Sequence, residues 1–208
     1  MVLAAGRSSR MGRPKPLLDF DGRAALELVL DAGAGGGVAE SVIVAPAGHE
    51  AALSEVMTRT RARGRIVVNP DPGSEQVRSL QLALETIRND RPEAFLVHPV
   101  DYPLALADDY RLLLDAFRGS QGASEVFIPS HGGRRGHPIL CAGALLDAFL
   151  RLTPGGTARD VISSAKVAHV PTPNAGVLED MDTPEDYARL LEVHRARRRA
   201  AQIRGQPS

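Results

Sequence analysis

The chain has 208 residues, 43% of them hydrophobic and 24% charged, and its 25 Lys and Arg residues equal its 25 Asp and Glu residues in number. A length of this order buries one substantial core, and the charge balance argues against a general attraction to nucleic acid or to a membrane surface. No apolar run reaches membrane-spanning length, and the single cysteine, Cys141, excludes an internal disulfide. Since the N-terminus also lacks a signal-peptide pattern, we expect a cytoplasmic protein.

Short apolar, β-branched runs alternate with helical patterns along the chain. Strands are predicted at 1–3, 41–45, 65–68, 94–98, 125–129 and 166–170, and helices at 24–32, 49–61, 77–88, 108–117, 143–150 and 184–199. This alternation predicts an α/β fold, a Rossmann-like three-layer sandwich with a mostly parallel central sheet. We expect one domain over residues 1–193, followed at 194–208 by a solvated basic helix end and tail.

The connection after the first strand carries two glycines and several cations. Gly6 and Gly12 let the backbone approach a ligand, and the cations around them match the charge of a polyphosphate. A Walker A loop is excluded, because five residues separate these glycines and Arg13 follows the second of them. The loop therefore predicts a nucleoside triphosphate site of another kind, the alternative being a solvated basic turn.

The segment LAAGRSSRMGRPKPLL, residues 3–18, resembles the signature LAAGxSxRMGxxKxLL of the molybdenum cofactor nucleotidylyltransferases. The resemblance continues through NPDPGSEQVRSLQLAL (69–84), HPVDYPL (98–104), GGRRGHPIL (132–140), GGTARDVI (155–162) and VLEDMDTPEDYARL (177–190). The GRRGHP and GTAR segments are most similar to the CTP:molybdopterin cytidylyltransferase branch. The resemblance implies the nucleotide-diphospho-sugar transferase fold and transfer of CMP from CTP to the phosphate of molybdopterin, with release of pyrophosphate. The family's usual Gly-Asp-Gln-Pro turn is replaced here by HPVDYPL, in which the aspartate remains while the residues on either side of it differ.

Other functions remain open at this stage. They are GMP transfer to molybdopterin, NMP transfer to another phosphorylated small molecule, and a non-catalytic nucleotide-binding protein whose partner is a molybdenum hydroxylase apoenzyme. Lys15 and Asp101 together favour an enzyme, because a protein that only binds has no need of both.

Displacement at an α-phosphate develops negative charge that cations must stabilise. Lys15 is the expected partner of the α-phosphate, and the guanidinium groups of Arg10 and Arg7 suit the β- and γ-phosphates. The expected catalytic residues are thus Lys15, Arg10 and Asp101, whereas Arg13 is expected to be solvated. The expected nucleotide-binding residues are Leu3, Ala4, Ala5, Gly6, Arg7, Ser9, Arg10, Gly12, Lys15 and Ser79. For Ser79, an ordinary role near a helix N-terminus is an equal alternative.

A triphosphate-dependent reaction also calls for Mg²⁺, which prefers carboxylate oxygens. Asp101 is the first candidate because a buried strand delivers it to the carboxyl edge of the sheet, although a turn role is its alternative. Asp182 is the expected second ligand, with Asp180 as its close competitor. Glu185 and Asp186 are explained by helix capping.

The acceptor site is predicted from cations in two segments. Gly132, Gly133 and Gly136 allow the first segment to fold over a ligand. The expected acceptor-binding residues are Arg134, Arg135, His137 and Arg159. For the two adjacent arginines, exposed loop charges are an equal alternative. His98 is expected to make ordinary hydrogen bonds at its strand end, and Cys141 to behave as a small buried apolar residue.

Overall fold

The middle layer of the protein is a mixed β-sheet. The computed structural model describes residues 1–6, 11–71, 76–153 and 155–203. Across these residues the strands follow the order β3-β2-β1-β4-β7-β5-β6, and β8 pairs with β5. The strands are β1 (Val2–Leu3), β2 (Ser41–Pro46), β3 (Gly64–Asn69), β4 (Ala94–Pro99), β5 (Val126–His131), β6 (Arg134–Arg135), β7 (Ile139–Ala142) and β8 (Val167–Pro171). Only β7 and β6 run against the common direction, which confirms the mostly parallel α/β fold.

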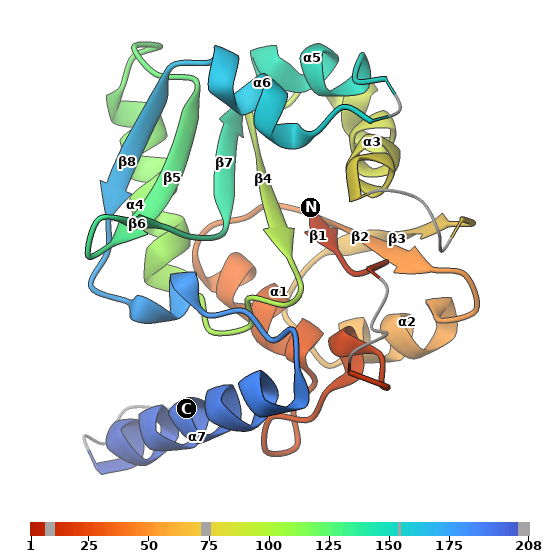
Figure 1. Ribbon diagram of the computed structural model, residues 1–208, viewed down its shortest axis with the longest axis vertical. Coiled ribbons are helices and arrows are strands. Elements are labelled where there is room, and N and C mark those ends of the chain that lie inside the picture. Colours follow the sequence, from red (N-terminus) through yellow and green to blue (C-terminus); the bar gives the residue numbers. More distant parts are fainter. Residues whose placement is uncertain (7–10, 72–75, 154, 204–208) are drawn as a thin grey trace.

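Helices cover both faces of this sheet (Figure 1). On one face lie α1 (Ala25–Gly35), α2 (Glu50–Thr58) and α4 (Ala107–Gly119), and on the other lie α3 (Gln76–Ile87), α5 (Leu146–Leu150) and α6 (Ala158–Ser164). The 3₁₀ turns are η1 (Lys15–Leu17), η2 (Arg88–Asp90), η3 (Gly143–Leu145) and η4 (Ala175–Leu178). The three layers are those expected from the alternation of strands and helices.

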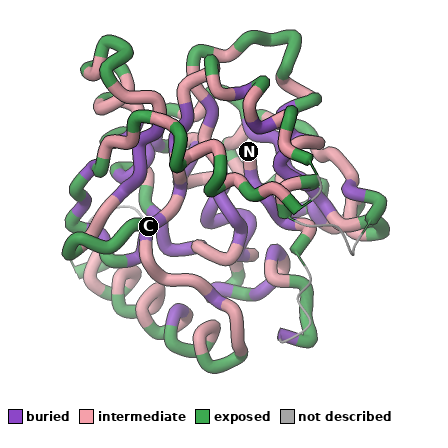
Figure 2. Tube along the Cα trace, turned by 45° about the horizontal axis from the view of Figure 1, so that its top comes forward, coloured by how far each residue is buried: buried purple, intermediate pink, exposed green. Residues whose placement is uncertain are grey.

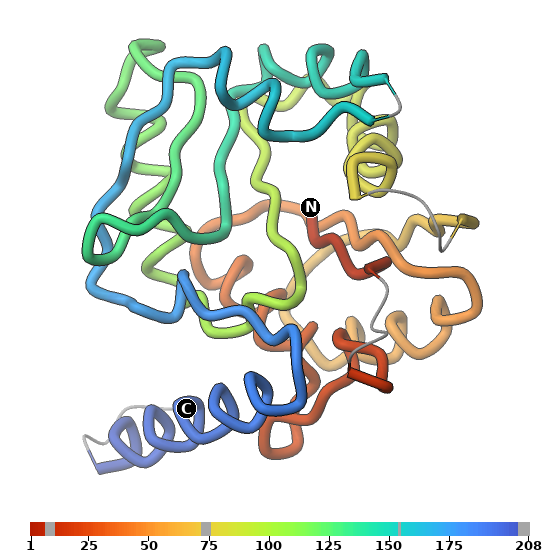
Figure 3. Tube along the Cα trace, in the orientation of Figure 1, coloured from red at the N-terminus to blue at the C-terminus, as the bar shows by residue number. Residues whose placement is uncertain are grey.

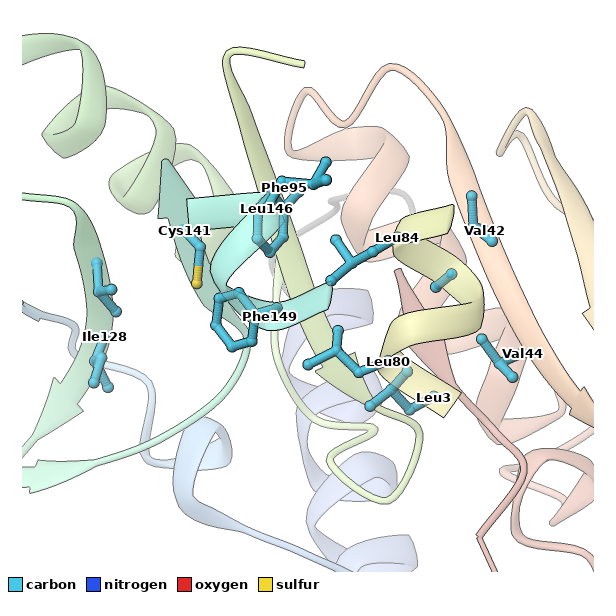
Figure 4. Packing of buried hydrophobic residues seen from close by; sticks show 12 residues of the cluster. Leu3, Val42, Val44, Leu80, Leu84, Phe95, Ile128, Cys141, Leu146 and Phe149 are labelled. Carbon is cyan, nitrogen blue, oxygen red and sulfur yellow. The ribbon is translucent and has the colours of Figure 1, made fainter. Parts of the chain in front are cut away.

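The core follows from the period of two in the strands. In β2, Val42 and Val44 join the cluster under α3 and α5, whereas Ile43 and Ala45 join the cluster under α1 and α2. Figure 4 shows the first cluster, in which Leu80 on α3 and Phe149 on α5 face the sheet. Both sides of the central strands are therefore buried. Figure 2 shows which parts of the chain are buried and which are exposed.

The structure contains elements that the sequence did not predict. One of them is the two-residue strand β6 at Arg134–Arg135, which pairs with β5. The strand β7 at Ile139–Ala142 and the helix α6 at Ala158–Ser164 were expected as loop. In β7, four apolar or small residues pair with β4 and β5, so that an antiparallel strand fills a position in the sheet. In α6, Asp160 accepts hydrogen bonds from the backbone N–H and the hydroxyl of Thr157, a capping box that starts the helix.

The last helix, α7 (Pro184–Ile203), lies beyond the sheet and runs without a break past residue 193. Arg195 donates to Asp21, and Arg197 donates to the Leu104 carbonyl and to the Asn174 side chain. Its basic end is thus attached to the domain, contrary to the expected solvated helix end, while residues 204–208 lie outside the described ranges. None of the described helices is both long and apolar enough to cross a membrane.

The order of strands places the site. β1 lies between β2 and β4 and is parallel to both, with Leu3 opposite Pro99 of β4. The chain therefore leaves β1 and β4 side by side at the carboxyl edge of the sheet, at a point where the strand order reverses (Figure 3). Such a point is where open α/β sheets bind ligands.

The opposite end of β1 gives a stability prediction. Met1 lies opposite Val97, so the β4 residues Ala94 to Leu96 extend beyond it, beside a cavity of about 410 Å³ that Met1 and Phe95 help to line. The buried Met1 amino group donates to the Leu96 carbonyl, and burial lowers its pKa from 8.0 to about 5. Three β-branched residues added before Met1 are expected to extend the strand into this cavity and raise Tm, by about 2 to 4 °C for each kcal/mol gained.

The pH dependence checks the cause of this gain. Between pH 8 and pH 5 the unfolded chain takes up an amino-terminal proton that the folded chain rejects, so the free energy of unfolding falls as the pH is lowered. The extended chain places its ammonium in solvent and is expected to lose this contribution to the slope. The loss is clearest between pH 8 and pH 7, above the range in which the buried His98 and His137 also lower the stability. Urea unfolding at several pH values measures this pH dependence of the free energy of unfolding. A Gly-Ser-Gly extension, which lacks β-branched residues, is the control. Equal Tm values and equal slopes in all three chains would contradict the prediction.

Candidate active site

Three charged side chains meet at the carboxyl edge of the sheet. The Nζ atom of Lys15 donates to Asp182 Oδ1 at 2.7 Å and to Asp101 Oδ2 at 3.3 Å. Their side chains are 14%, 35% and 25% exposed for Lys15, Asp182 and Asp101, so the cluster is partly shielded from water. These residues are far apart in the sequence, and the fold alone brings them together.

Each member of the cluster is held by its local structure. Lys15 begins the short helix η1, directly after Pro14. Asp101 stands two residues beyond β4, and its carbonyl accepts the N–H of Met181 at 2.9 Å, which draws the 179–182 segment against it. The structure places Asp182 on Lys15, whereas Asp180 acts electrostatically on the neighbouring Tyr102.

The side chain of His98, near the end of β4, hydrogen-bonds to the turn that carries Asp101. Its Nε2 donates to the Tyr102 carbonyl at 2.9 Å, and its Nδ1 is hydrogen-bonded to the Tyr110 hydroxyl. Burial lowers the pKa of His98 to about 3, so the ring is neutral. The expectation of ordinary hydrogen bonds at a strand end is confirmed.

The environment of Asp101 suits a cation. Burial raises the pKa of its carboxyl group, and the Lys15 ammonium acts in the opposite direction. Its Oδ1 atom is buried and has no hydrogen-bond partner among the described residues. Asp182 offers a second carboxylate here, since Lys15 forms ion pairs with both Asp101 and Asp182. Magnesium usually takes one or two protein carboxylates together with phosphates and water, so these oxygens fit such an ion.

The smaller of two adjoining cavities lies over the end of β1. Its volume is about 300 Å³. It is lined by Leu3, Ala4, Ala5, Gly6, Lys15, Gln76, Ser79, Pro99, Val100 and Asp101. Seven of the residues expected in the site, six of them as nucleotide-binding residues, therefore surround one space. Ser79 lies within α3 rather than at its start, is buried, and accepts a hydrogen bond from Asn69 at 2.9 Å.

The larger cavity continues from the smaller one between the sheet and the helices α3, α5 and α6. Its volume is about 570 Å³. The two cavities share Leu3, Gln76, Pro99 and Asp101. Deeper in, apolar side chains such as Leu80 and Phe149 form its wall. The carboxylate of Asp101 thus stands where two ligands in the two cavities would meet.

The remaining expected residues are distributed differently. Of the acceptor candidates only His137 lines the larger cavity, while Arg134 and Arg135 are exposed on β6 and Arg159 is exposed on α6. Gly12 has a positive φ of +62° but lines neither cavity. Arg7, Ser9 and Arg10 lie outside the described residues. The buried Cys141 also lines the larger cavity.

Sequence reasoning missed Tyr102, which lines the larger cavity. The ring of Tyr102 lies 4.5 Å from the ring of His137, and burial raises its pKa to about 12. Burial lowers the pKa of His137 to about 4, opposed by a hydrogen bond with the Val97 backbone. Proximity to Asp101 in the chain was the available signal for Tyr102, but nothing in the sequence pairs it with His137.

Comparison with known proteins places this geometry in a family. The model of the MobA-like NTP transferase domain matches residues 1–170. A molybdenum cofactor cytidylyltransferase of Escherichia coli K12 is 26% identical over 193 residues, which cover 92% of this chain and 94% of that protein. A CMP-5'-(3-aminopropyl)phosphonate synthase of Streptomyces rubellomurinus is 42% identical over 99 residues, which cover 43% of this chain and 15% of that protein.

Solved structures show the same fold. The crystal structure of Rv0371c from Mycobacterium tuberculosis H37Rv has a TM-score of 0.75 at 26% identity, covering 92% of this chain and 96% of that one. A complex of the same protein with manganese has a TM-score of 0.71 at 24% identity, with the same coverage. The chain belongs to the MobA-like NTP transferase family and is a nucleotidyltransferase.

Proposed function

We propose that the protein transfers CMP from CTP to the phosphate of molybdopterin, with Mg²⁺, and releases pyrophosphate. The observation that carries the proposal is the cluster of Lys15, Asp101 and Asp182 where two cavities adjoin. One cavity is bounded by the glycine loop and suits a nucleotide. The other suits the body of the acceptor, whose phosphate then lies beside the α-phosphate of the nucleotide.

In this reaction an oxygen of the acceptor's phosphate attacks the α-phosphorus of CTP, and the bond to pyrophosphate breaks. No general base is required, since a phosphate monoester is already an anion at neutral pH. Lys15 stabilises the charge that grows on the α-phosphate oxygens. Asp101 and Asp182 would hold the metal ion, which when bound supplies positive charge to the triphosphate. The neutral His98 fixes the end of β4 that carries Asp101.

The choice of CTP rests on relatives. The curated relatives described above are named for a cytidylyl group or for CMP. The choice of molybdopterin rests on the E. coli relative and on the larger cavity, whose volume suits a bulky acceptor. A second candidate acceptor is a small phosphonate, favoured by the 42% identity to the phosphonate synthase over 99 residues. The manganese complex of the Mycobacterium protein supports a divalent cation, and use of CTP is consistent with a cytoplasmic protein.

Pyrophosphate release tests the proposal. CTP, GTP, ATP and UTP are each incubated with molybdopterin, with 3-aminopropylphosphonate and with sugar phosphates, in the presence of Mg²⁺. We expect turnover with CTP and molybdopterin above all other pairs. Turnover with GTP or with another acceptor would replace the substrates proposed here. No turnover with any pair would favour a non-catalytic nucleotide-binding protein, for example one that serves a molybdenum hydroxylase.

A further inference from the structure

The wall of the larger cavity carries little charge. None of the described residues that line it is Lys or Arg, and its one carboxylate, Asp101, stands at the junction with the smaller cavity. Much of the lining is apolar, including Val77, Leu80, Ile139 and Phe149. A charged group carried into this space would lose its hydration without finding an opposite charge on the described wall. The part of an acceptor that enters it is therefore uncharged.

One polar pair interrupts the apolar wall. The rings of His137 and Tyr102 lie 4.5 Å apart, and both residues line the cavity. The Nδ1 atom of His137 is buried and has no hydrogen-bond partner among the described residues. A buried polar atom left in this state has lost its hydration without compensation, and a ligand that hydrogen-bonds it would recover that loss. The ring is also neutral, because burial lowers its pKa to about 4.

The arginines of the same region have other positions. Arg134 and Arg135 are exposed on β6, and Arg159 is exposed on α6, so none of them lines the cavity. Among the described residues, Lys15 is the cation that lies at the junction of the two cavities, where the proposed reaction takes place. An acceptor is therefore oriented with its phosphate toward Lys15 and its uncharged end toward His137.

We propose that His137 and Tyr102 determine which acceptor is used, by hydrogen-bonding and packing against an uncharged, ring-shaped body that bears heteroatoms. This inference rests on the proposed function, because it takes the larger cavity as the acceptor site. His137 thereby recognises the body of the acceptor rather than its phosphate. Acceptors with a charged remote end, such as the ammonium of 3-aminopropylphosphonate, are rejected.

Equilibrium binding without nucleotide tests this assignment. The probe is 6-hydroxymethylpterin phosphate, followed by its fluorescence, with phenyl phosphate and 3-aminopropylphosphonate as competitors. In the wild-type protein we expect the pterin phosphate to bind more tightly than phenyl phosphate, and the aminophosphonate to bind least. His137→Phe keeps a ring but removes both nitrogens. It is therefore expected to weaken the binding of pterin phosphate about 10-fold and to leave the binding of phenyl phosphate unchanged.

Two further variants separate recognition from folding. His137→Asn places an amide near the position of Nδ1 and is expected to restore most of the affinity for pterin phosphate. His169→Phe, on an exposed position of β8, is expected to change nothing. Thermal melts of all variants show whether each one folds, and the order of affinities in the wild-type protein decides the question even if a variant does not fold.

The outcomes distinguish the two proposals. Equal binding of the aminophosphonate and the pterin phosphate, or unchanged binding of the pterin phosphate to folded His137→Phe, overturns the role of His137 and Tyr102. Pyrophosphate release from CTP with the aminophosphonate but not with the pterin phosphate also overturns the role of His137 and Tyr102. That result would still agree with nucleotidyl transfer as the activity of the protein. A lack of pyrophosphate release with every acceptor overturns the proposed function, and the binding order still decides the selectivity of the cavity.

Discussion

Asp101→Ala is expected to lower kcat for pyrophosphate release by about 10³-fold or more, because the proposed main ligand of the metal ion is lost, and with it several kcal/mol of transition-state stabilisation. The variant is expected to fold. Burial disfavours the charged form of Asp101, and the backbone contact between its carbonyl and Met181 does not depend on the side chain. Its Tm should therefore equal or slightly exceed that of the wild type.

Metal binding gives a second measurement of the same variant. Titration of Mn²⁺, followed by its electron paramagnetic resonance signal, is expected to show weaker binding in Asp101→Ala. Asp182→Ala is expected to weaken Mn²⁺ binding as well, and Asp180→Ala less, because Asp182 shares Lys15 with Asp101. Asp115→Ala, on the exposed surface of α4, is the matched control. Full activity in Asp101→Ala would show that the metal ligand is another residue.

The strand ends could be located from the sequence because they depend on local information. The apolar run at 94–98 is long enough to mark a buried strand, and in a parallel sheet its end falls at the ligand-binding edge. Asp101 follows that run by a few residues, so its position at the edge was predictable. Lys15 could be placed near Asp101 because the loop that carries Lys15 follows the first strand, and in a parallel sheet such loops lie at the same edge.

The acceptor region was harder to predict because its side-chain directions depend on tertiary contacts. Arg134 and Arg135 form an edge strand that pairs with β5, and this pairing leaves their side chains exposed. His137 lies two residues after Arg135 and lines the larger cavity. The glycines around these residues indicated flexibility but not direction. The charge of the four acceptor candidates suggested a shared role, but only His137 among them lines the larger cavity.

Some missed features did have a local signal. Thr157 and Asp160 have the spacing of a capping box, which marks the start of α6. By contrast, Arg197 bonds to Leu104 and Asn174, residues remote from it in the chain. The run of arginines around it looks like a solvated helix end, and no pattern within the run distinguishes Arg197 from its neighbours. Long-range contacts of single polar residues, such as those of Arg197, could therefore not be predicted from the sequence.

Lys15→Met is expected to lower kcat by about 10²- to 10³-fold, the cost of removing one preorganised charge from the transition state. The substitution keeps much of the length of the side chain but removes its ammonium group. Lys15→Arg is expected to restore little activity, because a planar guanidinium does not reproduce a compact ammonium between two carboxylates. Arg13→Met, on an exposed position of the same loop, is expected to retain wild-type kcat.

The same variant is expected to differ from Asp101→Ala in its metal binding. Removal of Lys15 leaves the carboxylates of Asp101 and Asp182 without the cation that they share, so Mn²⁺ is expected to bind as tightly as in the wild type or more tightly. Loss of turnover with metal binding retained assigns Lys15 to the phosphate that reacts. Loss of both in Lys15→Met would instead mean that the lysine only organises the metal ligands, and its proposed contact with the α-phosphate would then be wrong.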